Sequence, residues 1–145
     1  MKKLLTALSL LLGTLSIKAQ AVNDSTAFHA YIYNKEYDVY MRINFYEQDV
    51  IISWEEMFGP LPGFLSKQNN NFCWIITEAK IDGNKAELEM VNDYGSEDLV
   101  ATLTQENDSV YTLRQGAGST IKVPNKGKWQ KLPSTLTFIR RKTEK

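Results

Sequence analysis

The chain has 145 residues, with 17 Lys and Arg, 17 Asp and Glu and a formal net charge of zero at neutral pH. Three of the lysines, Lys2, Lys3 and Lys18, lie in an N-terminal segment that we expect to be cleaved off, as argued below. The rest of the chain has 14 basic and 17 acidic residues, a net charge near −3. That balance argues against nucleic acid or an anionic membrane as the partner. The single cysteine, Cys73, excludes an internal disulfide.

The first 21 residues have the features of a signal peptide. A short positive segment, Met1–Lys3, precedes an apolar run from Leu4 to Leu15, and small residues follow at Ala19 and Ala21. The run is shorter than the ~20 residues that a membrane-spanning helix needs. We therefore expect cleavage after Ala21, or after Ala19, and export to the periplasm or out of the cell. No cysteine lies near the cleavage site, which excludes a lipid anchor.

The remaining residues, 22–145, are predicted to form one all-β domain. Alternation of apolar and polar side chains indicates strands at residues 28–33, 39–46, 50–54, 72–81, 85–91, 99–103, 110–113, 119–123 and 136–139. Asp82-Gly83 between two such runs predicts a hairpin. The pattern is typical of an antiparallel meander of about eight or nine strands, and the tight turns favour a β-barrel over a two-sheet sandwich.

The long connection 55–71 interrupts this pattern and is rich in apolar side chains. Gly59 and Pro60 cut short the best candidate helical turn, Trp54–Phe58. We expect the apolar residues of the connection either to plug an open end of the β-structure or to form an exposed patch, and the plug is favoured because large exposed patches are uncommon. As a lid over a cavity they would do both. The candidate ligand-binding or partner-binding residues are Trp54, Phe58, Leu61, Phe64, Leu65, Trp74 and Trp129.

The C-terminal part offers a second, weaker candidate surface. Three lysines surround Trp129 in a loop bounded by Pro124 and Pro133, which suggests either a small basic docking point or an ordinary solvated turn; they are Lys126, Lys128 and Lys131. The last residues, Arg140–Lys145, are predicted to be a flexible, solvated tail.

Side chains suited to catalysis are few. His29 is the single histidine, and no neighbouring motif supplies a nucleophile or an orienting carboxylate. Cys73 is in phase with Ile75, Ala79 and Ile81, which predicts a core position. Acidic residues cluster at Glu55-Glu56 and at Asp93, Glu97 and Asp98, and paired acids of this kind could serve glycoside hydrolysis or bind calcium. The segment Asp93–Asp98 lacks the ligand order of an EF-hand loop, and turn chemistry explains it. The sequence therefore predicts no catalytic residue, no metal site and no cofactor.

The function favoured by these features is a non-enzymatic binding module for a small apolar ligand or another envelope protein. A small exported barrel resembles lipocalin-like proteins in fold alone, because their Gly-x-Trp start signal is absent. The alternative is a periplasmic inhibitor or immunity-type protein that blocks an enzyme or toxin. A small hydrolase is the third reading, with Glu55, Glu56 and His29 as the first residues to substitute. The sequence leaves the oligomeric state open.

Overall fold

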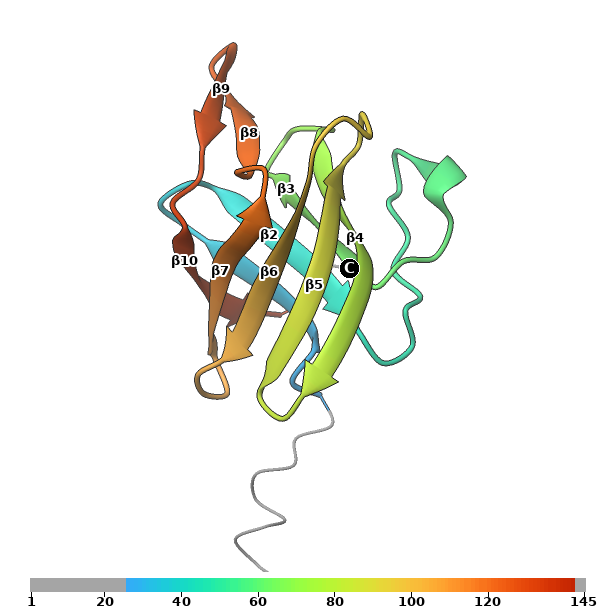
Figure 1. The fold of residues 1–145 in the computed structure, drawn as a ribbon, viewed down its shortest axis with the longest axis vertical. Coiled ribbons are helices and arrows are strands. Elements are labelled where there is room, and N and C mark those ends of the chain that lie inside the picture. Colours follow the sequence, from blue (N-terminus) through green and yellow to red (C-terminus); the bar gives the residue numbers. More distant parts are fainter. Residues whose placement is uncertain (1–25, 143–145) are drawn as a thin grey trace, which may run out of the picture.

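The computed structural model describes residues 26–142, so the predicted signal peptide, residues 1–21, lies outside the described residues. The strands and one short 3-10 turn follow in this order (Figure 1): β1 His29–Asn34, β2 Val39–Asn44, η1 Glu56–Phe58, β3 Gly63–Lys67, β4 Cys73–Asp82, β5 Lys85–Asn92, β6 Asp98–Gln105, β7 Val110–Gly118, β8 Lys122–Asn125, β9 Lys128–Lys131 and β10 Thr135–Arg141. Within 26–142 no helix has the length and apolar character that crossing a membrane requires.

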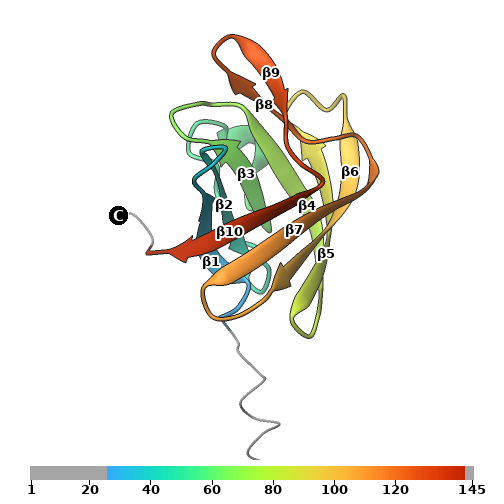
Figure 2. The same cartoon turned by 90° about the vertical axis from the view of Figure 1, so that its left-hand side faces the viewer.

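Eight strands close into an antiparallel barrel in the order β1-β10-β7-β6-β5-β4-β3-β2. The predicted barrel is thereby confirmed against the two-sheet sandwich. The first and last strands form the seam, where Tyr31 pairs with Arg141 and Tyr33 with Ile139. Strands β8 and β9 form a separate two-stranded sheet, which projects from one end of the barrel (Figures 1 and 2).

Strand β5 illustrates why these residues form a barrel wall. Ala86, Leu88 and Met90 are buried, whereas Lys85 and the glutamates between them are exposed. Successive side chains of a strand point to opposite faces, so this alternation places one face inside the barrel and the other in solvent. The predicted hairpin into β5 is confirmed, and Gly83 at its turn has a φ of 62°.

The barrel interior is an apolar core to which all eight wall strands contribute. Each strand places at least one large side chain there that is 1 % exposed or less: Ile32, Met41, Leu65, Trp74, Leu88, Leu103, Tyr111 and Phe138. Burial of these side chains is the main stabilising contribution to the fold.

Two polar side chains tie the seam to this core. Buried Asn34 on β1 donates from Nδ2 to the carbonyl of Thr137 on β10 at 2.8 Å. Arg140 donates to the hydroxyl of Tyr111 at 2.5 Å and to the carbonyl of Ala27, just before β1, at 3.4 Å. Hydrogen bonds of this kind satisfy buried polar groups where the first and last strands of the barrel meet.

The segment 50–63 differs from the predicted strand pattern. The predicted strand 50–54 is wrong, because within it only Val50 forms a bridge, with Leu61. Strand β3 lies inside the segment 55–71, where the sequence pattern predicted a connection and no strand. Gly63 permits it, since a Cβ at this position would collide with the carbonyl oxygen of Arg42 on the neighbouring strand β2.

The C-terminal part contains more strand than the sequence pattern indicated. The loop between the two prolines is largely the β8–β9 hairpin, whose turn has Lys126 at a φ of 55° and Gly127 at 79°. The expected strand 119–123 begins only at Lys122. Strand β10 continues through Arg141, so two residues of the predicted flexible tail belong to the barrel.

In the structure the long connection is the segment 49–62 between β2 and β3, and the name is used for it from here on. It packs on the outside of the barrel and forms an outer layer with side chains of β1–β5. Its buried members are Tyr31, Tyr40, Ile52, Phe64, Cys73 and Ile75, with Tyr33, Val50, Trp54, Phe58, Leu61 and Val91 packed against them. The connection therefore neither plugs an open end nor forms a bare patch, and both expectations are corrected. Tyr31, Tyr40 and Phe64 point outward from the barrel and form an apolar surface separate from the interior core, and the connection covers this surface.

We predict that this outer layer stabilises the fold through Ile52. Ile52 is 1 % exposed and Ile51 is 50 % exposed, so the two neighbours are a matched pair. Ile52→Ala should lower the free energy of unfolding by about 2–5 kcal/mol, and Ile51→Ala should change it by less than about 0.5 kcal/mol. Urea denaturation of both variants measures the difference. Equal, small effects would contradict packing of the connection on the barrel.

Candidate functional site

The seven candidate residues separate into three places. Trp54, Phe58, Leu61 and Phe64 belong to the outer layer. Leu65 and Trp74 lie in the barrel core and are 0 % exposed. Trp129 stands on β9 and is 53 % exposed. The structure therefore does not gather the seven around one internal cavity, and Trp129 is the member most accessible to a ligand.

Trp129 forms an aromatic cluster at the β8–β9 end of the barrel. Its ring lies 4.8 Å from that of Phe72 and 6.5 Å from that of Tyr94, measured between centroids, in edge-to-face geometry. Phe72 and Tyr94 are 5.5 Å apart. Tyr94 is 71 % exposed, so two large aromatic side chains face solvent side by side. Such pairs stabilise one another and still present open ring faces.

These rings form one side of a cleft of about 220 Å³, which we call the aromatic end cleft. Its other side is polar: Lys122 on β8 and Glu97 form an ion pair at 3.0 Å, with each side chain about one-third exposed. Trp74 also lines the cleft, and its Nε1 donates to the carbonyl of Lys122 at 2.9 Å. The cleft thus combines flat apolar surfaces with a partly exposed charged pair.

The β5–β6 turn places Tyr94 at the rim. Buried Asn92 accepts hydrogen bonds from the backbone N–H groups of Ser96 and Glu97 and donates to Ser96 Oγ. Gly95, with a φ of 73°, completes the turn. Sequence reasoning missed Tyr94 and Lys122, and it read Glu97 only as a turn acid. An exposed tyrosine in a short polar turn was the available signal.

Cys73 is buried as predicted, but it faces the outer layer. A register shift between Ile76 and Glu78 breaks the alternation of β4, so the expected phase with Ala79 and Ile81 does not hold. Burial, followed by the nearby charges of Asp93 and Glu55, raises the pKa of the Cys73 thiol to about 12. The thiol is therefore protonated at neutral pH and is a poor nucleophile.

The groups proposed for a hydrolase lie apart in the fold. His29 is on β1, in a groove whose lining includes neither Glu55 nor Glu56. Asp93 is near Glu55, and the pKa of Asp93 is raised chiefly by desolvation and further by the charge of Glu55. In residues 26–142, no group of three or more His, Cys, Asp or Glu side chains could hold a metal ion.

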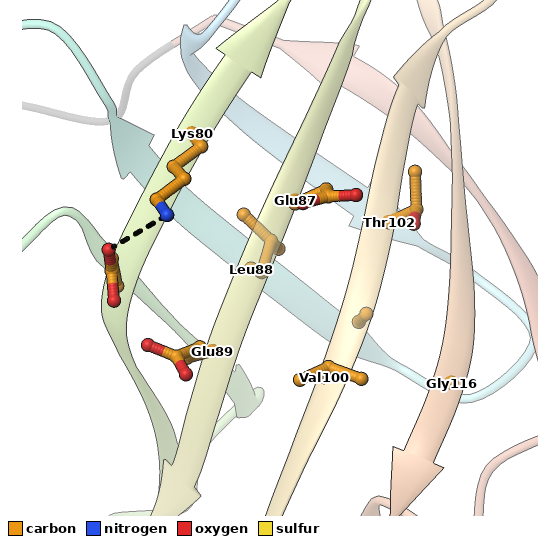
Figure 3. A pocket seen from close by; sticks show the side chains of 9 residues that line it. Lys80, Glu87, Leu88, Glu89, Val100, Thr102 and Gly116 are labelled. Carbon is orange, nitrogen blue, oxygen red and sulfur yellow. Dashed lines mark ion pairs between the residues drawn. The ribbon is translucent and has the colours of Figure 1, made fainter.

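A second concave surface, of about 300 Å³, lies on the outside of strands β4–β7 (Figure 3). Small residues on β7, including Gly116, leave it hollow beside Val100. Glu78 and Glu89 stand directly opposite each other across β4 and β5, and Lys80 pairs with Glu78 at 3.7 Å. A hydrogen bond to Glu78, together with its charge, raises the pKa of Glu89. Opposed like charges weaken a strand pair.

This acid pair predicts a pH-dependent stability. Because the pKa of Glu89 is raised in the folded protein, stability falls as the pH rises through that pKa and is regained in acid. Glu89→Gln should therefore raise the urea midpoint at pH 7 and give no gain below about pH 4. Glu87→Gln is the matched control, because Glu87 lies opposite Lys80. A gain of the same size from Glu87→Gln would contradict the assignment.

Comparison of the chain with protein-family models gives no match. Comparisons with curated proteins and with solved structures give no match either. Function must therefore be inferred from the chemistry of the clefts and surfaces themselves, because a barrel fold supports many unrelated functions.

Proposed function

We propose that the chain is an exported, non-enzymatic binding protein that holds a ring of a small ligand in the aromatic end cleft. The observation that carries this proposal is the exposure of Tyr94 and Trp129, at 71 % and 53 %, beside a partly exposed ion pair. Contiguous exposed aromatic surface is uncommon without a binding role. Tryptophan and tyrosine are also the residues most enriched at sites that contribute strongly to binding.

The dimensions of the cleft limit the ligand. At about 220 Å³ the cleft is smaller than the ~300–1,000 Å³ typical of sites that enclose a drug-sized molecule. A single ring, or the terminal ring of a longer chain, is therefore the group that it would accept. Stacking on Trp129 would bury one face of the ring, and Glu97 and Lys122 would hydrogen-bond to hydroxyl or amide groups at its edge. A sugar ring combines these two properties.

This proposal places the ligand at the rim of the barrel. In a lipocalin-like arrangement the ligand would occupy the interior. Here the interior positions of all eight wall strands carry buried side chains, including Trp74 and Phe138. The apolar ligand expected from the sequence would therefore bind through part of its surface, at the outside of the barrel.

A protein partner is the second candidate, and the projecting β8–β9 hairpin favours it. Trp129 and three exposed lysines, Lys126, Lys128 and Lys131, stand on this hairpin. A projecting element with one exposed aromatic anchor is suited to insertion into the active site of an enzyme or toxin with an acidic rim. Recovery of a stoichiometric protein partner from an envelope extract would favour this alternative over the small ligand.

Trp129 and Trp54 lie in different places, so their indole N–H resonances provide the test. Trp129 is in the cleft, whereas Trp54 lies in the outer layer with its Nε1 bonded to the carbonyl of Asn71 at 2.7 Å. Addition of the small-molecule fraction of an envelope extract should shift the indole N–H resonance of Trp129 and leave that of Trp54 in place. Trp129→Ala and Tyr94→Ala should each weaken binding about tenfold or more, a loss of roughly 1.4 kcal/mol.

Met57→Ala is the matched control, because Met57 is an apolar side chain that is 86 % exposed and lies outside the cleft. Its binding should equal that of the parent protein. An unchanged Trp129 resonance, or equal losses in the control and the two cleft variants, would argue against the aromatic end cleft as the binding site. Native mass spectrometry of protein isolated from its source then gives the mass of the ligand.

A further inference from the structure

A third cavity, of about 710 Å³, is lined by residues of β1, β2 and β10. It is larger than the aromatic end cleft and the concave surface on β4–β7, and its charged lining residues are mainly basic. Strands β1 and β2 form its floor. The start of the long connection, Asp49–Ile51, lines it on one side, and the end of β10 with the residue that follows, Arg140–Lys142, lines it on the other. We call it the arginine groove. It shares no lining residue with the aromatic end cleft, so it is independent of the function proposed above.

Strand register brings two arginines to one face of this groove. Tyr31 on β1 pairs with Arg42 on β2 and, on its other side, with Arg141 on β10. Directly opposed residues present their side chains on the same face of a sheet, and neighbouring strands are about 4.8 Å apart. The two arginine Cα atoms are therefore about 10 Å apart across Tyr31. This juxtaposition depends on the seam and cannot be seen in the sequence.

Aromatic rings hold both guanidinium groups in place. The Cζ atom of Arg42 lies 4.8 Å from the ring centre of Tyr31, and that of Arg141 lies 4.0 Å from the ring centre of Tyr33. A guanidinium group over a ring keeps the N–H donors at its edge available for an oxyanion. Ordering of the two side chains before binding reduces the entropy lost when an anion binds.

The charge of the groove is not neutralised by the protein. Neither Arg42 nor Arg141 forms an ion pair within residues 26–142. Arg140 is occupied by Tyr111 and backbone carbonyls, including that of Asp108. The remaining lining cation is Lys142.

The carboxylates in or beside the groove are fewer than its cations. Asp49 is the one carboxylate among the lining residues, and it accepts a hydrogen bond from Asn44 Nδ2 at 3.1 Å. Asp38 accepts a hydrogen bond at 2.5 Å from the hydroxyl of Tyr33, whose ring lies under Arg141. Both donors are neutral, so the two carboxylates balance only part of the charge of Arg42, Arg140, Arg141 and Lys142. A local excess of positive charge therefore remains on a domain whose acidic residues outnumber its basic ones.

We propose that the arginine groove binds a small anion with two acid groups, one held by Arg42 and the other by Arg141. Carboxylate and phosphate oxygens both match the paired N–H donors of a guanidinium group. The separation of the two arginines selects a molecule whose acid groups are several ångströms apart. Since the groove is open to water, each contact is worth less than a buried one, and a dissociation constant of about 0.1–1 mM is expected.

Isothermal titration at constant ionic strength, with the complete mature protein, tests this proposal. Citrate and pyrophosphate are the probes with two or more acid groups, and acetate and inorganic phosphate are the smaller controls. Citrate, pyrophosphate or both should bind about tenfold more tightly than the small anions. Arg42→Gln and Arg141→Gln should each weaken that binding about tenfold, and Arg42→Lys and Arg141→Lys should recover only part of it.

Arg114→Gln is the matched control, because Arg114 is an exposed arginine on β7 that does not line the groove. It should bind the probe as the parent protein does. Equal weakening by Arg114→Gln would indicate a general charge effect and overturn the proposal. Absence of binding by either larger probe up to about 10 mM would overturn it as well.

The variant Glu144→Gln separates an external ligand from the chain's own carboxylate Glu144. It adds no terminal carboxylate to Lys142, which lines the groove. We expect the probe to bind equally to the parent protein and to Glu144→Gln. Binding that appears only in Glu144→Gln would assign the groove to the chain's own Glu144 and would overturn the proposal. Urea midpoints of all the variants confirm that the barrel stays folded.

Discussion

Pairing between β1 and β10 is the constraint on which the rest of the structure depends. Tyr31, Ile32 and Tyr33 pair with Arg141, Arg140 and Ile139. No other pair of neighbouring strands in the barrel is so far apart in the sequence. Without this seam the antiparallel sheet would keep two open edges, and the side chains on its concave face would not be enclosed. The seam also fixes the neighbourhood of Arg42, Tyr31 and Arg141. Closure therefore produces both the core and one of the two proposed binding surfaces.

Because the barrel interior is filled by buried side chains, both proposed binding surfaces lie on the outside of the barrel. The outward side chains form three chemically different regions: an apolar layer covered by the long connection, an acidic wall on β4–β6 and a cationic groove on β1, β2 and β10. The aromatic end cleft is a fourth region, where the β8–β9 hairpin meets the β5–β6 turn. We propose that two of these regions bind ligands of different chemistry, the aromatic end cleft an uncharged ring and the arginine groove an anion.

Alternation predicted the strands whose two faces differ in environment, and it failed where both faces are apolar. On β5 the outward residues are charged, so the period of two is plain. Segment 50–54 is apolar because Val50, Ile52 and Trp54 pack in the outer layer. This apolar pattern was interpreted as a strand, although only Val50 forms a bridge. The bulge after Ile76 reversed the phase expected for Cys73. Of the aromatic end cleft, only Trp129 and Trp74 were predicted, because Tyr94 and Lys122 meet the other cleft residues through contacts between distant parts of the chain. Arg141 of the arginine groove was missed for the same reason, since it meets Tyr31 through the seam.

Hydrogen exchange at the seam tests the central claim most directly. Hydrogen-bonded amides of Tyr31–Tyr33 and Ile139–Arg141 should exchange as slowly as those of the central strands β5 and β6, because opening the seam requires unfolding of the barrel. The protection of these amides should fall together with that of β5 and β6 as urea is added. Fast exchange confined to the seam amides, with β5 and β6 still protected, would show an open sheet and contradict the account.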